Sequence, residues 1–245
     1  MLRVSVLLPL PNPRLAPSWL AMKRIPTAEL LDNDAGTATE VADSLLDLRW
    51  FNKWFGGITT TRKTIQQVAG RAGRKSFSFL EVAAGSGYVP HSTRKTLSKH
   101  GIQLDVTLLD RAASHLGNGG RSIVGDALSL PFRDGSFDLV GCGLFAHHLS
   151  PERLVQFVNE GLRVSRCAVL INDLIRHPAH LALVYAGLPL YRSRITRHDA
   201  PASVVQAYTP DEMREILGKT AAARVEIDRS YLFRMGVIAW KAGAL

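Results

Sequence analysis

The sequence lacks the features that mark disulfide-bonded, zinc-binding and membrane-spanning proteins. It holds two cysteines in 245 residues, Cys142 and Cys167, and no cysteines or histidines with the spacing of zinc ligands. We therefore expect two buried packing thiols, no disulfide and no metal site. No apolar run approaches the roughly 18 residues of a membrane helix. With 46% hydrophobic and 21% charged residues, the chain is typical of a globular cytoplasmic protein.

Long runs of lysine and arginine are also missing, although the net charge of the chain is +9. Such a charge permits contacts with the phosphates of nucleic acid. Because there is no basic run and no RNA-binding signature, a nucleic-acid substrate is the less favoured interpretation. Four arginines and one aspartate between residues 176 and 199 instead predict either an anionic small substrate or a solvated segment.

A loop of small residues after a buried strand is the most distinctive feature that is present. Residues 77–82 predict the strand, residues 83–87 read Ala-Ala-Gly-Ser-Gly, and residues 91–99 predict a helix. Glycine costs conformational entropy in regular structure, so this loop indicates that a ligand approaches the backbone closely. We expect a nucleoside-type cofactor, with an ordinary strand-to-helix turn as the alternative. A dinucleotide fingerprint would need a glycine at position 88, where Tyr88 stands.

Acidic residues follow the next two predicted strands. Asp110 ends the apolar run of residues 104–109 and lies 23 residues after Gly87, which is where a doubly wound fold binds ribose hydroxyls. A carboxylate suits this task because it accepts hydrogen bonds from two neighbouring hydroxyls. Asp126 follows a short strand at 122–124. The alternative for Asp110 is an ordinary solvated loop aspartate.

Four markers in this order resemble the class I methyltransferases that use S-adenosylmethionine (SAM). The markers are the acid and glycine loop at 81–87, Asp110, Gly125-Asp126-Ala127, and a strand with a histidine pair at 135–149. In the family pattern an acidic residue precedes G-x-G-x-G, and Ala83 departs from its first glycine. The spacing after Asp126 resembles methyltransferases of quinone and small-molecule biosynthesis, the UbiE-like group of methyltransferase types 11 and 25.

The resemblance implies a Rossmann-like α/β fold with a mostly parallel sheet of seven strands, the last of them antiparallel. It also implies SAM as the cofactor, with Asp126 pairing with the adenine amino group and Leu128 lining the base pocket. The residues expected to bind SAM are Glu81, Ala83, Gly85, Gly87, Asp110, Arg111, Asp126, Ala127 and Cys142.

His147 and His148 are the candidate catalytic residues. They follow the fourth predicted strand, at the carboxyl edge where open α/β sheets place their sites. A hydroxyl or phenol acceptor benefits from losing its proton to a histidine, although binding both reactants in line supplies most of the rate. Adjacent side chains point in different directions, so we expect at most one to face the acceptor. The alternative is a structural or substrate-lining role.

The chain is expected to divide into a leader, a helical cap and a catalytic domain. Residues 1–21, which include four prolines, predict a disordered leader. Residues 22–75 are expected to form an N-terminal helical cap, and residues 76–245 the methyltransferase domain. An insertion at 174–209 is expected to act as a lid that contacts substrate, with an apolar helix around 181–190.

Four aromatic residues end the predicted helix that begins at Thr37, namely Trp50, Phe51, Trp54 and Phe55. We favour packing of this cluster against the sheet, because most such clusters belong to a core. The alternative is a lid over the cofactor that also contacts substrate.

The sequence therefore predicts a SAM-dependent methyltransferase that acts on a small molecule, by O- or C-methylation of an aromatic, polyketide or quinone-type acceptor. Two other classes stay open, a nucleic-acid methyltransferase and a non-catalytic SAM-binding protein. The first would carry an Asn/Asp-Pro-Pro-aromatic tetrad or a Pro-Cys nucleophile, whereas residues 141–144 read Gly-Cys-Gly-Leu. An inward-pointing arginine among Arg192, Arg194 and Arg197 would indicate an anionic acceptor, and three outward-pointing ones a neutral acceptor. The oligomeric state is left open.

Overall fold

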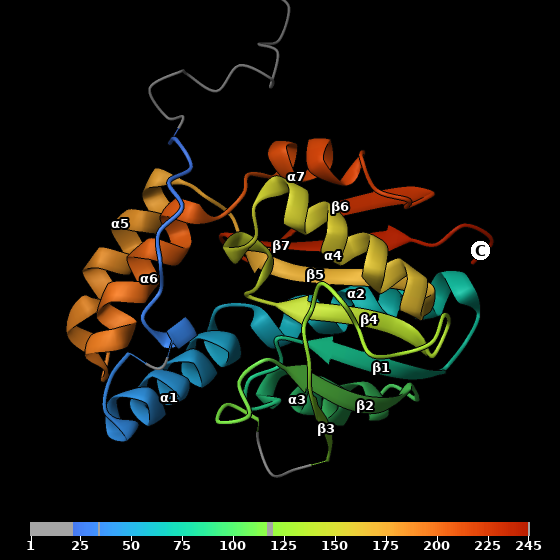
Figure 1. The fold of residues 1–245 in the computed structure, drawn as a ribbon, viewed down its shortest axis with the longest axis horizontal. Coiled ribbons are helices and arrows are strands. Elements are labelled where there is room, and N and C mark those ends of the chain that lie inside the picture. Colours follow the sequence, from blue (N-terminus) through green and yellow to red (C-terminus); the bar gives the residue numbers. More distant parts are fainter. Residues whose placement is uncertain (1–21, 34, 117–119, 245) are drawn as a thin grey trace, which may run out of the picture.

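The computed structural model describes residues 22–33, 35–116 and 120–244, which contain a seven-stranded sheet in the order β3-β2-β1-β4-β5-β7-β6 (Figure 1). The strands are β1 (Ser76–Val82), β2 (Gln103–Asp110), β3 (Arg121–Val124), β4 (Phe137–Gly143), β5 (Ser165–Leu174), β6 (Arg224–Ser230) and β7 (Arg234–Trp240). The first five pair in parallel, and β7 runs antiparallel to β5 and β6. The predicted sheet is thus confirmed, and its strand order reverses between β1 and β4, where open α/β sheets bind ligands.

Helices cover both faces of the sheet (Figure 1). They are α2 (Gly57–Ala72) and α3 (Tyr88–Ser98) on one face, and α4 (Pro151–Val164) and α7 (Pro210–Leu217) on the other. Each face encloses a hydrophobic core, as expected for parallel strands buried on both sides. Cys142 lies in the core beside α4 and Cys167 in the core beside α2, and both are buried and free. The predicted packing thiols are therefore confirmed.

A third group of helices lies beyond the carboxyl ends of the parallel strands (Figure 1). Its members are η2 (Leu31–Asn33), α1 (Ala38–Trp54), η3 (Ala146–His148), α5 (Pro178–Gly187), η4 (Leu188–Leu190) and α6 (Arg194–Gln206). A capping box begins α1, because the side chains of Thr37 and Glu40 each accept from the other's backbone N–H. The sequence did not predict α6, since Pro201 lies inside it and proline usually ends a helix.

The expected packing of the aromatic cluster against the sheet is wrong. α1 packs on α6 and α2, and the side chains of Trp54 and Phe55 are 56% and 40% exposed. Phe51 meets Tyr191 edge to face, with ring centroids 5.2 Å apart. Periodicity identifies an apolar stripe on a helix but not the surface that the stripe meets. Here that surface is the segment between β5 and α7. The aromatic cluster therefore lies where the alternative interpretation placed it, in a lid over the expected cofactor site.

Residues 22–33, which we call the strap, run along α6 and reach η3 (Figure 1). The backbone N–H groups of Leu30 and Leu31 donate to the two carboxylate oxygens of Asp199, at 2.8 and 3.0 Å. The Arg24 guanidinium donates to the backbone oxygens of His147 and Leu149. These bonds fix the strap against the turn that carries the histidine pair.

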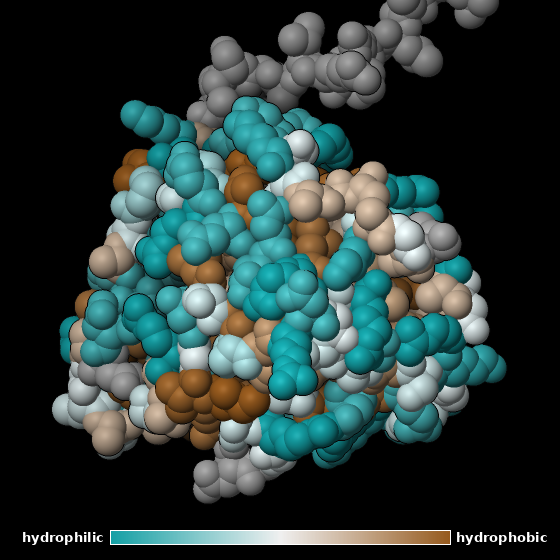
Figure 2. Space-filling model, turned by 45° about the vertical axis from the view of Figure 1, so that its right-hand side comes forward, coloured by the Kyte–Doolittle hydropathy of each residue, from teal (hydrophilic) through white to brown (hydrophobic). Residues whose placement is uncertain are grey.

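Most of the face in Figure 2 carries hydrophilic side chains, with smaller hydrophobic areas between them. Among the described residues, no helix is both long and apolar enough to cross a membrane. The predicted leader, residues 1–21, lies outside the described residues.

Candidate functional site

One cavity of about 800 Å³ opens at the carboxyl ends of β1, β2 and β4. Its wall on the sheet side includes the glycine loop at 83–86, the ends of those strands and the histidine pair. Its opposite wall comes from the strap, α1, α5, η4 and α6. The predicted N-terminal cap and insertion therefore face the same space as the glycine loop.

Asp110 organises the glycine loop. Its Oδ2 accepts a hydrogen bond from the Gly85 N–H at 2.8 Å, and its Oδ1 accepts from the Ala112 N–H at 3.0 Å. The carboxylate lines the cavity at the end of β2. Parallel pairing of β1 with β2 places the two strand ends side by side. Asp110 thus holds the loop in position while it faces the space that a ligand would fill.

Strained backbone gathers at the same cavity. Among the described residues, Ala83, Leu144 and Tyr231 are the non-glycine residues with positive φ, at 51°, 55° and 46°. All three line the cavity. Such conformations cluster at ligand-binding sites, where the surrounding structure enforces them. Ala83, which departs from the family pattern, therefore adopts the backbone conformation that the glycine would have.

Gly85 and Gly87 differ in what a side chain would meet. Both have positive φ, 49° and 69°, but a Cβ on Gly85 would point into open space, whereas one on Gly87 would lie 2.5 Å from Leu108 Cδ1. Gly87 does not line the cavity. We expected it to admit the cofactor; its place in the structure instead shows that it makes room for Leu108 in the core. Cys142, also expected at the cofactor, lies in the core outside the cavity, because successive side chains of a strand such as β4 point to opposite faces of the sheet.

The two glycines allow a matched test. Gly87→Ala is expected to lower the free energy of unfolding by about 1–3 kcal/mol more than Gly85→Ala, because overpacking against Leu108 adds to the positive-φ strain that both share. Gly85→Ala is expected to keep its fold and to weaken cofactor binding, since its methyl group enters the cavity. Chemical denaturation and calorimetry with S-adenosylhomocysteine (SAH), the demethylated product, measure the two effects. Equal losses of stability would contradict the assignment of Gly87 to packing.

Glu81 presents a buried carboxyl to the cavity. Its oxygens lie against β4, where Cβ atoms built on Gly141 and Gly143 would come within 3.3 and 3.5 Å of them. Burial raises the pKa of Glu81 to about 8, and the part of the chain that the structure describes offers its carboxyl no hydrogen-bond or charge partner. A buried group of this kind fits a cationic ligand atom, such as the ammonium of the amino-acid portion of SAM.

The remaining predicted cofactor residues surround the far end of the same wall. Asp126 Oδ1 accepts from the Leu128 N–H at 2.9 Å, which shapes the loop after β3. Arg111, Ala127 and Leu128 line the cavity beside it. The structure therefore brings together seven of the nine residues expected to bind SAM and leaves out Gly87 and Cys142.

His147 is enclosed by acids. Its Nδ1 lies 2.6 Å from Asp173 Oδ1, and its backbone N–H donates to Asp173 Oδ2 at 3.0 Å. Its Nε2 lies 3.5 Å from Glu29 Oε1. Burial alone would lower the pKa of His147, but Asp173 and then Glu29 raise it to about 10. With a proton on both nitrogens, this side chain does not accept a proton from an acceptor at neutral pH.

His148 occupies the more open position. Its Nδ1 lies 2.9 Å from Asp32 Oδ2, and its Nε2 lies 3.8 Å from Glu29 Oε2. The side chain is 18% exposed, against 2% for His147. Both histidines line the cavity, with ring centroids 4.3 Å apart. The two rings do not point in different directions as expected, and His148 is the more accessible of the two.

Glu29, Asp32 and Asp173 were not singled out by the sequence. Glu29 and Asp32 reach the histidines only because the strap folds back over η3, and no local pattern marks such a contact. Asp173 is the last buried residue of β5, so it carries the same signal as Asp110, an acid where a parallel strand ends.

The side of the cavity opposite the glycine loop is apolar. It includes large side chains that are well exposed, among them Phe55, Leu183, Leu190 and Leu232. Arg192, Arg194 and Arg197, the arginines considered from the sequence, do not line it. Arg192 lies near Asp47, Arg194 pairs with Glu40, and Arg197 donates to the backbone oxygen of Tyr191. Because three arginines that point away from the site were expected to indicate a neutral acceptor, this arrangement favours one.

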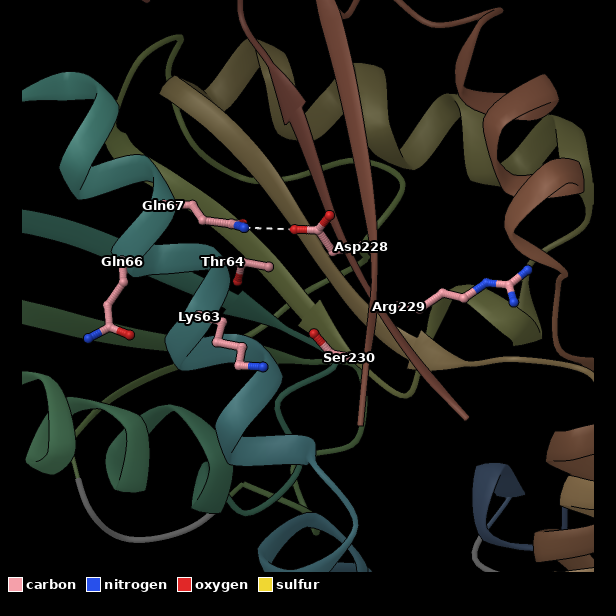
Figure 3. Close-up of a pocket in the computed structure, with 7 residues that line it drawn as sticks. All are labelled: Lys63, Thr64, Gln66, Gln67, Asp228, Arg229 and Ser230. Carbon is pink, nitrogen blue, oxygen red and sulfur yellow. Dashed lines mark hydrogen bonds between the residues drawn. The ribbon is translucent and has the colours of Figure 1, made fainter. Parts of the chain in front are cut away.

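A second hollow, of about 530 Å³, lies between α2 and β6 (Figure 3). Its side chains are polar, and Gln67 donates to Asp228 across it at 2.7 Å. It shares no residue with the cavity at the glycine loop. We regard it as a surface groove bridged by this bond.

Comparisons with known proteins bear on the domain and the fold of the chain. Residues 80–167 match the family model described as "Methyltransferase domain". The solved structure of the plantazolicin methyltransferase BpumL, in complex with a desmethylPZN analog and SAH, matches with a TM-score of 0.62 and 14% identity, over 86% of this chain and 92% of that one. The plantazolicin methyltransferase BamL matches with a TM-score of 0.60 and 13% identity, over 82% and 91%. No curated protein matches the sequence.

At these identities the solved structures establish the fold, and the family model matches residues 80–167. The chain has the class I methyltransferase fold. The predicted enzyme class, a SAM-dependent methyltransferase, is confirmed.

Proposed function

We propose that this protein transfers the methyl group of SAM to a neutral, mostly apolar small molecule. One observation carries the proposal: a single cavity joins the glycine loop with its acids to an apolar wall from α1, α5 and η4. Small-molecule sites are typically concave and apolar with a few polar groups. An aromatic, polyketide or quinone-type acceptor, as in the quinone-biosynthesis group that the sequence resembles, suits such a wall.

The residues of the sheet side bind and orient the cofactor. We assign Glu81 to its ammonium, Asp110 to the ribose hydroxyls and Asp126 to the adenine amino group. Bound SAM supplies an electrophilic methyl group on a sulfonium. Because Gly85 leaves open space beside the loop, the backbone is accessible there. The loop is held by Asp110, so little reorganisation is needed on binding.

The residues of the cap hold the acceptor and exclude water. Phe51 and Tyr191 pack on each other across the boundary between α1 and the insertion, which closes the apolar side of the cavity. Holding acceptor and methyl donor in line converts a bimolecular reaction into an effectively unimolecular one, which supplies most of the rate. We propose a cytoplasmic location with this activity, because both cysteines are free thiols and reduced thiols are typical of that compartment.

The proposal has a direct test. The purified full chain is expected to bind SAH with micromolar affinity in calorimetry. With SAM it is expected to release more SAH in the presence of a neutral phenol or quinol than with the same compound carrying a carboxylate, because no free arginine of the insertion faces the cavity.

Absence of heat and of a thermal shift at millimolar SAH would overturn the cofactor assignment. Preference for the carboxylated compounds would overturn the neutral acceptor and leave the cofactor assignment standing.

A further inference from the structure

Three side chains with metal-binding atoms converge on the wall of the cavity. Glu29 comes from the strap, and His147 and His148 come from η3. One ligand atom from each lies within 4.8 Å of the other two. All three residues line the cavity. The cluster therefore combines two imidazoles and one carboxylate at a place that a ligand can reach.

Both imidazoles are oriented in the way that metal-binding histidines are. The Nδ1 of His147 lies 2.6 Å from Asp173, and the Nδ1 of His148 lies 2.9 Å from Asp32. A carboxylate at one ring nitrogen fixes the tautomer and directs the other nitrogen at a metal. Both Nε2 atoms accordingly face Glu29, at 3.5 and 3.8 Å.

The side chains of this cluster are held in place by their neighbours. His147 Nε2 is buried and makes no hydrogen bond among the residues that the structure describes. Glu29 Oε1 accepts from Ser203 and from Gln206, at 2.6 Å each. These two bonds hold the carboxylate in place, and its Oε2 faces His148. The nearest acceptor to His147 Nε2, Glu29 Oε1, lies 3.5 Å away, which is an ion-pair distance and longer than a hydrogen bond. A ligand closer to both groups would satisfy this nitrogen better.

We propose that Glu29, His147 and His148 bind one divalent transition-metal cation of the Zn²⁺ type. Two ligands about 2.1 Å from a tetrahedral metal are about 3.4 Å apart. Here His147 Nε2 lies 3.5 Å from Glu29 Oε1 and His148 Nε2 lies 3.8 Å from Glu29 Oε2. One ligand atom from each residue lies within 4.8 Å of the others, so a small closure of the cluster would complete the site. Imidazole ligands favour Zn²⁺ and its neighbours over Mg²⁺ and Ca²⁺.

Three carboxylates supply the charge that such a cation requires. Glu29 binds it directly, while Asp32 and Asp173 act through the histidines. The three protein ligands leave one tetrahedral position, as in catalytic zinc sites. Because all three ligands line the cavity, that position is open to an oxygen atom of a bound molecule. If the proposed function holds, on which this step rests, the acceptor class narrows to molecules with a hydroxyl or phenol group.

The test uses the full chain after removal of metals with a chelator. Equilibrium dialysis against Zn²⁺ followed by metal analysis is expected to give one bound ion per chain. Co²⁺ in its place is expected to give the visible absorption of a tetrahedral or five-coordinate site. His148→Gln and Glu29→Gln are expected to lower Zn²⁺ affinity at least a hundredfold. Asp32→Asn, which removes only the support of His148, is expected to lower it about 10–100-fold.

His100→Gln is the matched control, because His100 is exposed in the turn after α3 and is expected to bind Zn²⁺ as the unchanged chain does. Variants are compared only where circular dichroism shows the native fold. His147→Gln is not used, since its site is almost fully buried. No bound metal in the unchanged chain, or equal binding by His148→Gln and Glu29→Gln, would overturn the site.

Cofactor binding is read separately, by SAH calorimetry on the metal-free chain. Zn²⁺ binding without SAH binding would overturn the proposed function and support the metal site. SAH binding without Zn²⁺ binding would overturn the metal site and leave the proposed function in place.

Discussion

Asp110→Ala is expected to lower the affinity of the protein for SAH by about tenfold to several hundredfold. Each hydrogen bond to a charged acceptor contributes about 1.5–3 kcal/mol, a factor of roughly 10 to 150 in affinity. The structure adds a second reason for the loss. Asp110 accepts from the N–H groups of Gly85 and Ala112, so the alanine variant also releases the glycine loop. Calorimetry with SAH measures the change.

Two further variants separate these causes. Asp110→Asn keeps the shape of the side chain and one acceptor oxygen, so it is expected to retain more affinity than the alanine variant. Asp105→Ala is the control, because Asp105 lies in the same strand, pairs with Arg121 at the surface and does not line the cavity. If Asp110→Ala bound SAH as tightly as Asp105→Ala, Asp110 would be a loop aspartate with no part in cofactor binding.

The part of the site on the sheet could be predicted because each piece is local in sequence. Glu81 and Asp110 each end a buried run that reads as a strand. In a parallel sheet all such ends meet at one edge, so position along the chain translates directly into position in space. The role of Asp126 came from the family resemblance, because β3 before it is mostly exposed. The cofactor half of the cavity therefore followed from local sequence except at Gly87 and Cys142, whose positions depend on core packing.

The half of the cavity formed by the strap, α1 and the insertion could not be predicted from local sequence. Glu29 meets His147 across 118 residues of chain. The strap that brings it there is held by contacts of Arg24 and Asp199, which no periodic pattern in the sequence marks. The packing partner of the aromatic residues of α1 was equally hidden. Their apolar stripe was visible, but whether it met the sheet or the insertion depended on α6, a helix that Pro201 concealed.

Spacing rules also failed at the proposed metal site. Motif searches for metal ligands rely on pairs close together in sequence, and here only the adjacent histidines are close. Adjacent residues in a 3₁₀ turn rarely share a ligand, because their side chains diverge. In η3 their rings lie 4.3 Å apart at 33°, and acids on both sides turn them toward Glu29. The prediction that no metal site exists followed from spacing, and the metal site proposed above revises it.

Affinity for SAH is expected to rise about tenfold per pH unit between pH 6 and 7 and to level off near pH 8. The reason is Glu81, whose burial raises its pKa to about 8 in the cofactor-free chain. At pH 6 this carboxyl is almost entirely protonated, and binding the cationic ammonium requires it to ionise. Binding therefore releases one proton, and a reaction that releases a proton is favoured by rising pH. Above pH 8 Glu81 is already ionised and the gain ends.

The ligand sets the upper limit of the pH range over which the affinity rises. An α-amino group has a pKa of about 7.7–8.0, so the free ligand loses its positive charge over the same pH range in which Glu81 becomes ionised. Calorimetry at pH 6.0, 6.5, 7.0 and 7.5, in buffers with different ionisation enthalpies, measures both the affinity and the number of protons released.

Glu81→Gln is the matched variant, because the amide fills the same space beside Gly141 and Gly143 and does not titrate. It is expected to bind SAH roughly 10–100-fold more weakly at pH 7.5, as a charged hydrogen bond becomes a neutral one, and with no dependence on pH between 6 and 7.5. A slope that persisted in Glu81→Gln would assign the proton to another group. A flat profile in the unchanged chain would mean that the buried carboxyl does not face the ammonium at all, and the orientation of the cofactor in the cavity would have to be reversed.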